Sequence, residues 1–273
     1  ARIAELAHEM PDATESQIGW KVVEEISIEA AQLLLPAFEQ YKGYNGRLSM
    51  QTDPRLARSA KALADQAEYF SHLAPNIIVK IPATEIGIEA IEDATYRGVN
   101  INVTVSFTVA QVVSAGEAIE DATYRGVNIN VTVSFTVAQV VSAGEAIERG
   151  LKRREAEGLD VSTMGPVVTL MVGRLDDWLK QVHNRDGLCF DPGYLEWAGV
   201  AAVKKSVAEF KARGLRSRVL VAAYRNALQW TEFVGGDLVL SPPFGWQKRF
   251  QASGIDPQPR MDIPVEPKIL DAL

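Results

Sequence analysis

Residues 90–117 read AIEDATYRGVNINVTVSFTVAQVVSAGE, and residues 118–145 repeat these letters without a change. Each copy holds the end of one expected helix, a strand and the start of the next helix, so the unit is one α/β step. Solenoid repeats usually come in three or more diverged copies, because one unit cannot bury its own apolar face. Two identical copies therefore indicate a recent duplication, an engineered insertion or a sequence-assembly error rather than a solenoid.

Apolar strands alternate with helices along the rest of the chain. Helical periodicity is present over 1–41, helices are expected over 85–97, 108–126, 136–157 and 194–213, and a further helix carries Leu56, Leu63, Ala67 and Phe70 on one face. The expected strands are Arg47–Thr52, Ile77–Ala83, Val99–Phe107, Val127–Phe135, Pro166–Val172, Arg218–Tyr224 and Asp237–Ser241. This alternation is typical of parallel βαβ units and predicts the α/β class. Since no linker rich in Pro, Gly or Ser divides the chain, we expect one domain over residues 1–273.

Composition excludes several classes of protein. The 273 residues are 47% hydrophobic and 23% charged, as in soluble globular chains. No apolar stretch approaches the roughly 18 residues of a membrane span. A net charge of -7 without a basic block disfavours a nucleic-acid partner. The single cysteine, Cys189, and a start unlike a signal peptide favour the cytoplasm.

Metal and cofactor sites are not expected. The histidines His8, His72 and His183 are scattered without the spacing of metal ligands. No glycine-rich phosphate loop of the dinucleotide-binding type occurs in the chain. We therefore expect chemistry carried by side chains alone.

Lys80 interrupts the apolar run Ile77–Ile81, which otherwise has the pattern of a strand covered on both faces. Burial of an unpaired ammonium group is costly and lowers the lysine pKa. A neutral amine can attack a carbonyl carbon and form a Schiff base. The alternative is a lysine at a strand end that extends its ammonium group to solvent.

The strand Val99–Phe107 separates polar and apolar side chains by parity. Asn100, Asn102, Thr104 and Ser106 share one face, and Ile101, Val103, Val105 and Phe107 share the other. A half-solvated strand would explain this pattern. In a barrel, the apolar set would face the helices, and the polar set would line the interior, where barrel sites form at strand carboxyl ends.

Four segments together resemble the transaldolase family: VKIPAT at 79–84, GVNINVTVSFTVAQ in the repeat, VGRLDDW at 172–178 and AAYRN at 222–226. The resemblance runs from about Ile3 to Ser241. It implies a TIM barrel and a transferase that works as a metal-free, Schiff-base aldolase. Such an enzyme moves a dihydroxyacetone unit from sedoheptulose 7-phosphate or fructose 6-phosphate to an aldose phosphate, in the pentose phosphate pathway.

The resemblance also implies a role for individual residues. Lys80 would be the Schiff-base lysine. The partners of the sugar hydroxyls and the catalytic water would be Asn102 and Thr104, or their copies Asn130 and Thr132, and Thr169 retains the hydroxyl of a family serine. Arg174 and Arg225 match the phosphate-binding arginines, a role that suits the planar guanidinium fork. Their alternative role is in surface salt bridges.

The chain departs from the family at several positions. Gln51 stands where transaldolases place a glutamate acid/base and where fructose-6-phosphate aldolases have glutamine, and an amide cannot exchange a proton with water. Met171 replaces a tyrosine of those aldolases, and Ala223 replaces a frequent serine. Family members carry two further strands before the first residue here. We therefore expect a barrel that is incomplete at the N-terminus and has one duplicated βα unit.

These departures leave alternatives to a transaldolase. They are a fructose-6-phosphate aldolase-like enzyme, a phosphosugar-binding protein without turnover, and an inactive truncated relative. The expected ligands are sugar phosphates, and a homodimer is the assembly considered.

Both copies of the repeat are expected to form strands. Asn102 and Thr104 would then lie beside Lys80, and Asn130 and Thr132 beside Thr169. The extra strand would move Lys80 away from Arg174 by one strand spacing, about 4.8 Å.

Overall fold

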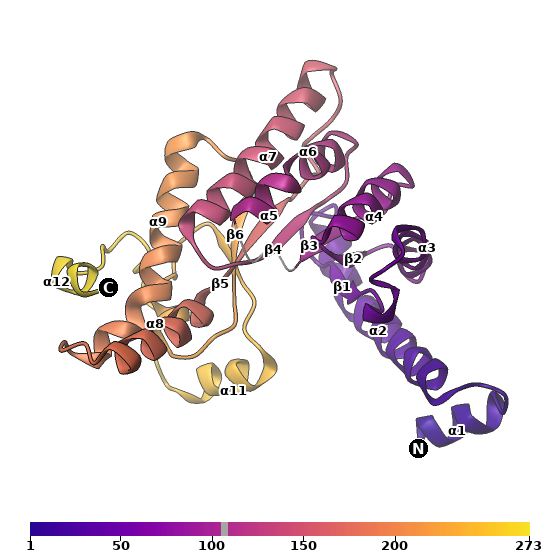
Figure 1. The fold of residues 1–273 in the computed structure, drawn as a ribbon, viewed down its shortest axis with the longest axis horizontal. Helices are drawn as coiled ribbons and strands as arrows, with labels where there is room; N and C mark the ends of the chain where they lie inside the picture. Colours follow the sequence, from indigo (N-terminus) through magenta and orange to yellow (C-terminus); the bar gives the residue numbers. More distant parts are fainter. Residues whose placement is uncertain (105–108) are drawn as a thin grey trace.

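The sheet is parallel, and its strands follow one another in chain order (Figure 1). The computed structural model describes residues 1–104 and 109–273. Within them the strands are β1 Leu48–Gln51, β2 Ile77–Pro82, β3 Ile101–Thr104, β4 Asn130–Ser134, β5 Val167–Met171, β6 Arg218–Ala222 and β7 Leu238–Leu240. Sequential parallel order requires a crossover between neighbours, which is the construction of a β/α barrel. Since β1 and β7 end the sheet, the fold is a curled, incomplete barrel.

The seven expected strands are confirmed, although each is shorter than its expected range. The expected strand Val99–Phe107 is described only as far as Thr104, and Val105, Ser106 and Phe107 lie outside the described residues. The parity of the described part is confirmed, because Ile101 and Val103 belong to the hydrophobic core between sheet and helices. Asn102 lies on the opposite face of β3, where it lines a cavity.

The helices are α1 Arg2–Glu9, α2 Glu15–Gln40, α3 Ala60–Ser71, α4 Glu85–Tyr96, α5 Val109–Ser114, α6 Gly116–Tyr124, α7 Val137–Ala156, α8 Val172–Asp186, α9 Ala198–Arg213, α10 Leu228–Thr231, α11 Phe244–Ala252 and α12 Pro267–Ala272, with 3-10 turns at Pro54–Leu56 and Pro192–Trp197. The helical periodicity expected over 1–41 is confirmed by α1 and α2, which are separated by a turn at Pro11, a residue that cannot donate a helical hydrogen bond. Thr14 then begins α2 with a capping box to Gln17.

The continuous helix expected over 108–126 is wrong. It is divided at Ala115 into α5 and α6, and Val113, expected on its apolar face, is exposed. The letters SAGEAIE at 142–148 form an uninterrupted part of α7, so local propensity does not cause the break. The surroundings differ: α6 packs between α4 and α7, whereas α7 packs against α9. Tertiary packing therefore decides where this helix ends.

The two copies of the repeat pair with each other through β3 and β4, with Asn102 opposite Asn130. The equivalent residues Asn100 and Asn128 make equivalent contacts with the segment that follows each of them. Asn100 Oδ1 accepts a hydrogen bond from the Asn128 backbone N–H at 3.0 Å, and Asn128 Oδ1 accepts one from Gly165 at 2.7 Å. At this position each copy contacts its successor through the same side-chain oxygen, which helps an additional unit to fit into the sheet.

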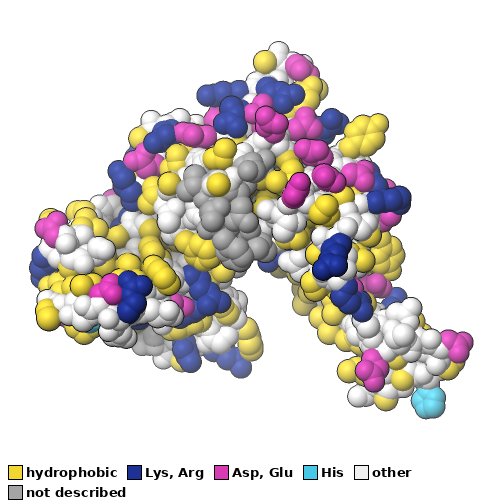
Figure 2. All heavy atoms as spheres, in the orientation of Figure 1, with side chains coloured by type: hydrophobic (Ala, Val, Ile, Leu, Met, Phe, Trp, Pro, Cys, Tyr) yellow, Lys and Arg dark blue, Asp and Glu magenta, His cyan; other side chains and the backbone are white. Residues whose placement is uncertain are grey.

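The helices over the repeat also make equivalent contacts, in which an arginine of one helix segment lies over a tyrosine of the preceding helix. The Arg125 guanidinium lies 5.5 Å from the ring centre of Tyr96, and that of Arg153 lies 4.2 Å from Tyr124. Figure 2 shows basic and acidic side chains mixed over this face, where Arg149 pairs with Glu120. No helix in the described residues combines the length and hydropathy of a membrane span.

Candidate active site

A cavity of about 450 Å³ lies on the face of the sheet opposite the helices. Strand alternation directs one side chain in two toward it. Its lining residues are Arg47, Leu48, Ser49, Ile78, Lys80, Asn102, Asn130, Thr132, Thr169, Met171, Leu220, Ala222 and Ser241. The structure therefore brings five of the nine predicted site residues together, and Thr104, Gln51, Arg174 and Arg225 are not part of this lining.

Lys80 lies in the middle of β2, opposite Gln51 of β1 and Asn102 of β3. Burial lowers the pKa of its ammonium group. Among the described residues, no carboxylate forms an ion pair with it, so the neutral form is not opposed by a fixed negative charge. This is the environment in which a lysine amine becomes a nucleophile.

The identical asparagines make different bonds. Asn102 Nδ2 donates to Ser49 Oγ at 2.9 Å, and its buried Oδ1 has no hydrogen-bond partner among the described residues. Asn130 Oδ1 accepts from Thr169 Oγ1, also at 2.9 Å. Asn102 thus lies beside Lys80 and Asn130 beside Thr169, as expected. The contacts to β1 and to β5 are divided between the two copies.

The two threonines of the repeat differ as well. Thr132 lines the cavity with Thr169. Thr104 is buried opposite Pro82, two residues beyond the position opposite Lys80, and does not line the cavity. Thr104 therefore lies on the strand next to that of Lys80, as expected, but its side chain is not in the cavity with Lys80.

Gln51 is exposed on β1, the first strand of the sheet. Its Nε2 donates to the Lys80 carbonyl oxygen at 3.3 Å. Thr52, which sequence reasoning missed, donates to the same oxygen from its backbone N–H at 3.2 Å and from Oγ1 at 3.0 Å. Both residues hold the backbone that carries Lys80.

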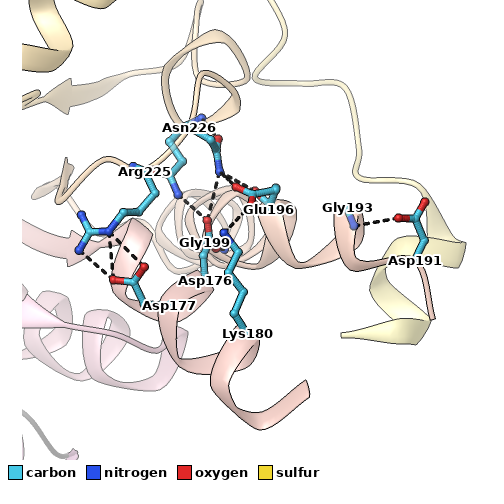
Figure 3. Close-up of polar contacts among 10 residues, drawn as sticks. Asp176, Asp177, Lys180, Asp191, Gly193, Glu196, Gly199, Arg225 and Asn226 are labelled. Atoms are coloured by element: carbon cyan, nitrogen blue, oxygen red, sulfur yellow. Dashed lines mark hydrogen bonds and ion pairs between the residues drawn. The ribbon is translucent and has the colours of Figure 1, made fainter. Parts of the chain in front are cut away.

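The two predicted phosphate arginines meet at Asp177 on α8. Arg225 Nη2 lies 2.8 Å from Asp177 Oδ2 (Figure 3). Arg174 Nη1 lies 3.9 Å from the same oxygen. Arg174 and Asp177 line a second cavity of about 430 Å³, with Phe135, Thr136, Leu175, Trp178 and Gln181. The arginines are therefore not part of the lining of the cavity that contains Lys80.

The loop that carries Arg225 packs closely on the first turn of α8. The Gly173 backbone N–H donates to the Ala223 carbonyl oxygen at 3.1 Å, and a Cβ at Gly173 would lie 2.2 Å from that oxygen. Ala223 has φ of 64°, in the left-handed region, which costs roughly 1–2 kcal/mol for a residue other than glycine. The surrounding packing holds the loop in this conformation.

Asp176 organises the residues behind Arg225, and the only sequence signal for it was the acidic pair after a strand. It is fully buried, and its carboxylate accepts from the Gly199 backbone N–H at 2.7 Å and from Asn226 Nδ2 at 3.3 Å (Figure 3). It also accepts from Gln229 Nε2. Gln229 Oε1 in turn accepts from the Arg225 backbone N–H. This network joins α8, α9 and the loop after β6.

Asp176 is expected to make stability depend on pH. Burial raises its pKa to about 7 from 3.8, although its N–H donors oppose the rise. The folded state therefore holds the proton more tightly than the unfolded state. The resulting stabilisation is complete below pH 4 and is lost as the pH rises through about 7, a change of up to about 4 kcal/mol.

Urea unfolding of the wild type and of Asp176→Asn between pH 4 and 8 measures this effect, since the amide does not titrate there. The wild type should lose stability relative to the variant as the pH rises. Asp186→Asn is the control, because the pKa of Asp186 is lowered by Arg185 and its effect has the opposite sign. The prediction would be contradicted if the free energy of unfolding of the wild type, relative to that of Asp176→Asn, stayed constant or rose between pH 4 and 8.

In the part of the chain that the structure describes, no three His, Cys, Asp or Glu residues gather as metal ligands do.

Comparison with known proteins adds independent information. The family model described as transaldolase/fructose-6-phosphate aldolase matches residues 1–124 and 114–262, and the two matches overlap inside the repeat. The chain is 32% identical over 150 residues to a transaldolase of Thiobacillus denitrificans, with 54% of this chain and 34% of the relative covered. It is 31% identical over 180 residues to one of Kocuria rhizophila, with 64% and 40% covered.

A transaldolase of a Parafrankia species is 28% identical over 232 residues, which cover 84% of this chain and 48% of the relative. The chain thus spans between about a third and a half of the curated relatives that it matches.

Proposed function

Because this chain belongs to the transaldolase and fructose-6-phosphate aldolase family, we propose that Lys80 forms a Schiff base with a keto sugar phosphate. The proposed activity is that of a transaldolase, which transfers a dihydroxyacetone unit from sedoheptulose 7-phosphate or fructose 6-phosphate to an aldose phosphate in the pentose phosphate pathway. The observation that carries this proposal is a partly buried lysine, without an ion-pair partner among the described residues, in a cavity lined by amide and hydroxyl groups.

The cavity chemistry supports these steps. The neutral Lys80 amine attacks the ketone carbon of the donor, and loss of water leaves an iminium ion. Its positive charge accepts the electron pair of the breaking C3–C4 bond, which releases the aldose and leaves an enamine on Lys80. The enamine then attacks the acceptor aldehyde, and water hydrolyses the new iminium. We propose that Asn102, Asn130, Thr132 and Thr169 bind the sugar hydroxyls and the water.

Proton transfer in this proposal does not use a carboxylate, because the described cavity lining contains none. Gln51 cannot supply or remove a proton either. We propose instead that a water molecule held by the hydroxyls of Thr132 and Thr169 carries the proton. Thr104, the equivalent of Thr132 in the first copy of the repeat, would take this role only in a chain from which the second copy, residues 118–145, is removed.

Gln51 favours a second candidate function, that of a fructose-6-phosphate aldolase-like enzyme. Such an enzyme would release dihydroxyacetone to water instead of transferring it. Assays with and without an acceptor aldose phosphate distinguish the two functions.

The wider setting is also proposed. The repeat and its flanks form one domain over residues 1–273, since the sheet is continuous across them. The net charge of -7 supports small-molecule rather than nucleic-acid partners, and the single cysteine supports a cytoplasmic location. A homodimer is the proposed assembly, and sedimentation equilibrium tests it.

Reductive trapping tests the function. Borohydride added with fructose 6-phosphate should leave one reduced sugar on the peptide that contains Lys80, as measured by peptide mass spectrometry. An adduct on another lysine, or none in a folded chain, would refute the Schiff-base function.

Arg174 and Arg225 are expected to contribute to the binding of phosphorylated ligands and not to that of ligands without a phosphate. Arg174→Ala or Arg225→Ala should raise the Michaelis constant for fructose 6-phosphate about tenfold or more, since a hydrogen bond to a charged group contributes about 1.5–3 kcal/mol. Dihydroxyacetone, which has no phosphate, serves as the control substrate in the same trapping assay. Equal losses on both substrates would exclude a phosphate-binding role.

A further inference from the structure

The ion pair between Arg225 and Asp177 is a contact that the proposed function does not explain. Its Nε lies 3.1 and 3.0 Å from the two carboxylate oxygens of Asp177, and its Nη2 lies 2.8 Å from Oδ2. The remaining nitrogen, Nη1, donates to the carbonyl oxygens of Ala223 and Tyr224 at 3.3 and 3.0 Å. All three guanidinium nitrogens therefore already have acceptors within the protein.

The Asp177 carboxylate occupies the position at Arg225 Nε and Nη2 that a bound phosphate group would occupy. Carboxylate and phosphate both receive the paired N–H groups of the guanidinium fork in the same plane. A phosphate could bind the Nε and Nη2 edge of Arg225 only by taking the place of the Asp177 carboxylate. The two anions compete for one cation.

The Asp177 side chain has few contacts that would prevent it from moving away from Arg225. In the described residues, its carboxylate contacts only Arg225 and, at 3.9 Å, Arg174. Its neighbour Asp176 is held by donors from α9 and from the loop after β6. One residue of the acidic pair thus anchors the loop, and the other neutralises the arginine.

A ligand can also reach this position. Asp177 and Arg174 line the 430 Å³ cavity, which Trp178 and Phe135 bound on its apolar side. The Asp177 side chain is 35% exposed and that of Arg174 is 58% exposed. If Asp177 swings away, both guanidinium groups become available to one anion.

We propose that Asp177 is an internal counter-ion that occupies the phosphate position at Arg225 and sets the affinity of this site for phosphorylated ligands. The inference rests on the proposed function only in taking phosphate as the ligand. Asp177 is a specificity-determining residue: it disfavours weakly held anions and yields to a phosphate that gains both arginines.

Binding of inorganic phosphate to the whole chain, measured by isothermal titration calorimetry, tests this inference. Asp177→Asn removes the competing charge and retains an oxygen that accepts from Arg225. It should bind phosphate about tenfold more tightly than the wild type, since charge-assisted bonds are roughly twice as strong as neutral ones. Asp186→Asn on the same helix, where Asp186 pairs with Arg185, should bind as the wild type does.

The gain must depend on Arg225. In an Arg225→Gln background, Asp177→Asn should improve phosphate binding by less than about threefold, because only the longer contact to Arg174 is then relieved. Unchanged or weaker binding by Asp177→Asn, or a full gain without Arg225, would overturn the inference. Circular dichroism verifies folding, and Asp177→Ser provides a second variant. Reductive trapping at Lys80 does not enter this measurement, so the two proposals can fail separately.

Discussion

Lys80→Met is expected to lose the reduced-sugar adduct to background, with the circular dichroism spectrum unchanged. Methionine has a similar length but no amine, so it cannot form a carbon–nitrogen bond with the substrate. The adjacent backbone should stay in place, because Gln51 and Thr52 bind the Lys80 carbonyl oxygen rather than its side chain. Lys61→Met is the control: Lys61 is exposed, pairs with Asp65 and should retain the adduct at Lys80.

The pH dependence of trapping tests the same residue in the wild type. Because burial lowers the pKa of Lys80, the reactive neutral amine should form at a lower pH than that of an ordinary lysine. The initial trapping rate should therefore rise with a midpoint clearly below 10.5. A midpoint at or above that value would show that the lysine is not activated, whatever its position in the cavity.

Deletion of residues 118–145 is expected to raise both thermal stability and affinity for fructose 6-phosphate. The remaining Asn100 and Asn102 are identical to the deleted Asn128 and Asn130, so β3 can pair with β5 through the groups that β4 uses now. A single Asn102 would then donate to Ser49 and accept from Thr169. Its Oδ1, which is buried without a partner in the described part of the chain, would then accept a hydrogen bond.

The expected gain can be given a magnitude. An unsatisfied buried polar group costs about 1–3 kcal/mol, and each kcal/mol shifts the melting temperature of a chain of this size by about 2–4 °C. Removal of one strand would also bring Arg174 closer to Lys80 by about 4.8 Å. Differential scanning calorimetry and ligand titration measure the two effects.

The same substitution, made in the full chain and in the shortened chain, tests whether the gain in stability comes from the hydrogen bonds of Asn102 or from the shorter chain alone. Asn102→Ala should cost about one hydrogen bond in the full chain and two in the shortened chain, so its penalty should roughly double there. A shortened chain that is less stable and binds less tightly than its parent would mean that the duplicate belongs to the working fold.

The sequence by itself determined the features that depend on local periodicity. Alternation with a period of two predicted the strands, the core face of Ile101 and Val103, and the opposite face of Asn102. A lysine inside an apolar run indicated Lys80, and its cavity position agrees with that indication. These features were readable because a residue's face depends on its neighbours in the same strand.

Only the tertiary structure decided the features that join distant segments. SAGEAIE is continuous in α7 but divided at Ala115, because the two copies have different neighbours. Asn102 and Asn130 differ for the same reason. The pairing of Asp177 with Arg225 joins residues 48 positions apart, and the donors to the buried Asp176 come from α9, from the loop after β6 and from α10. Identical letters acquire different partners once the chain packs, since the free energy of a side chain depends on what surrounds it in space.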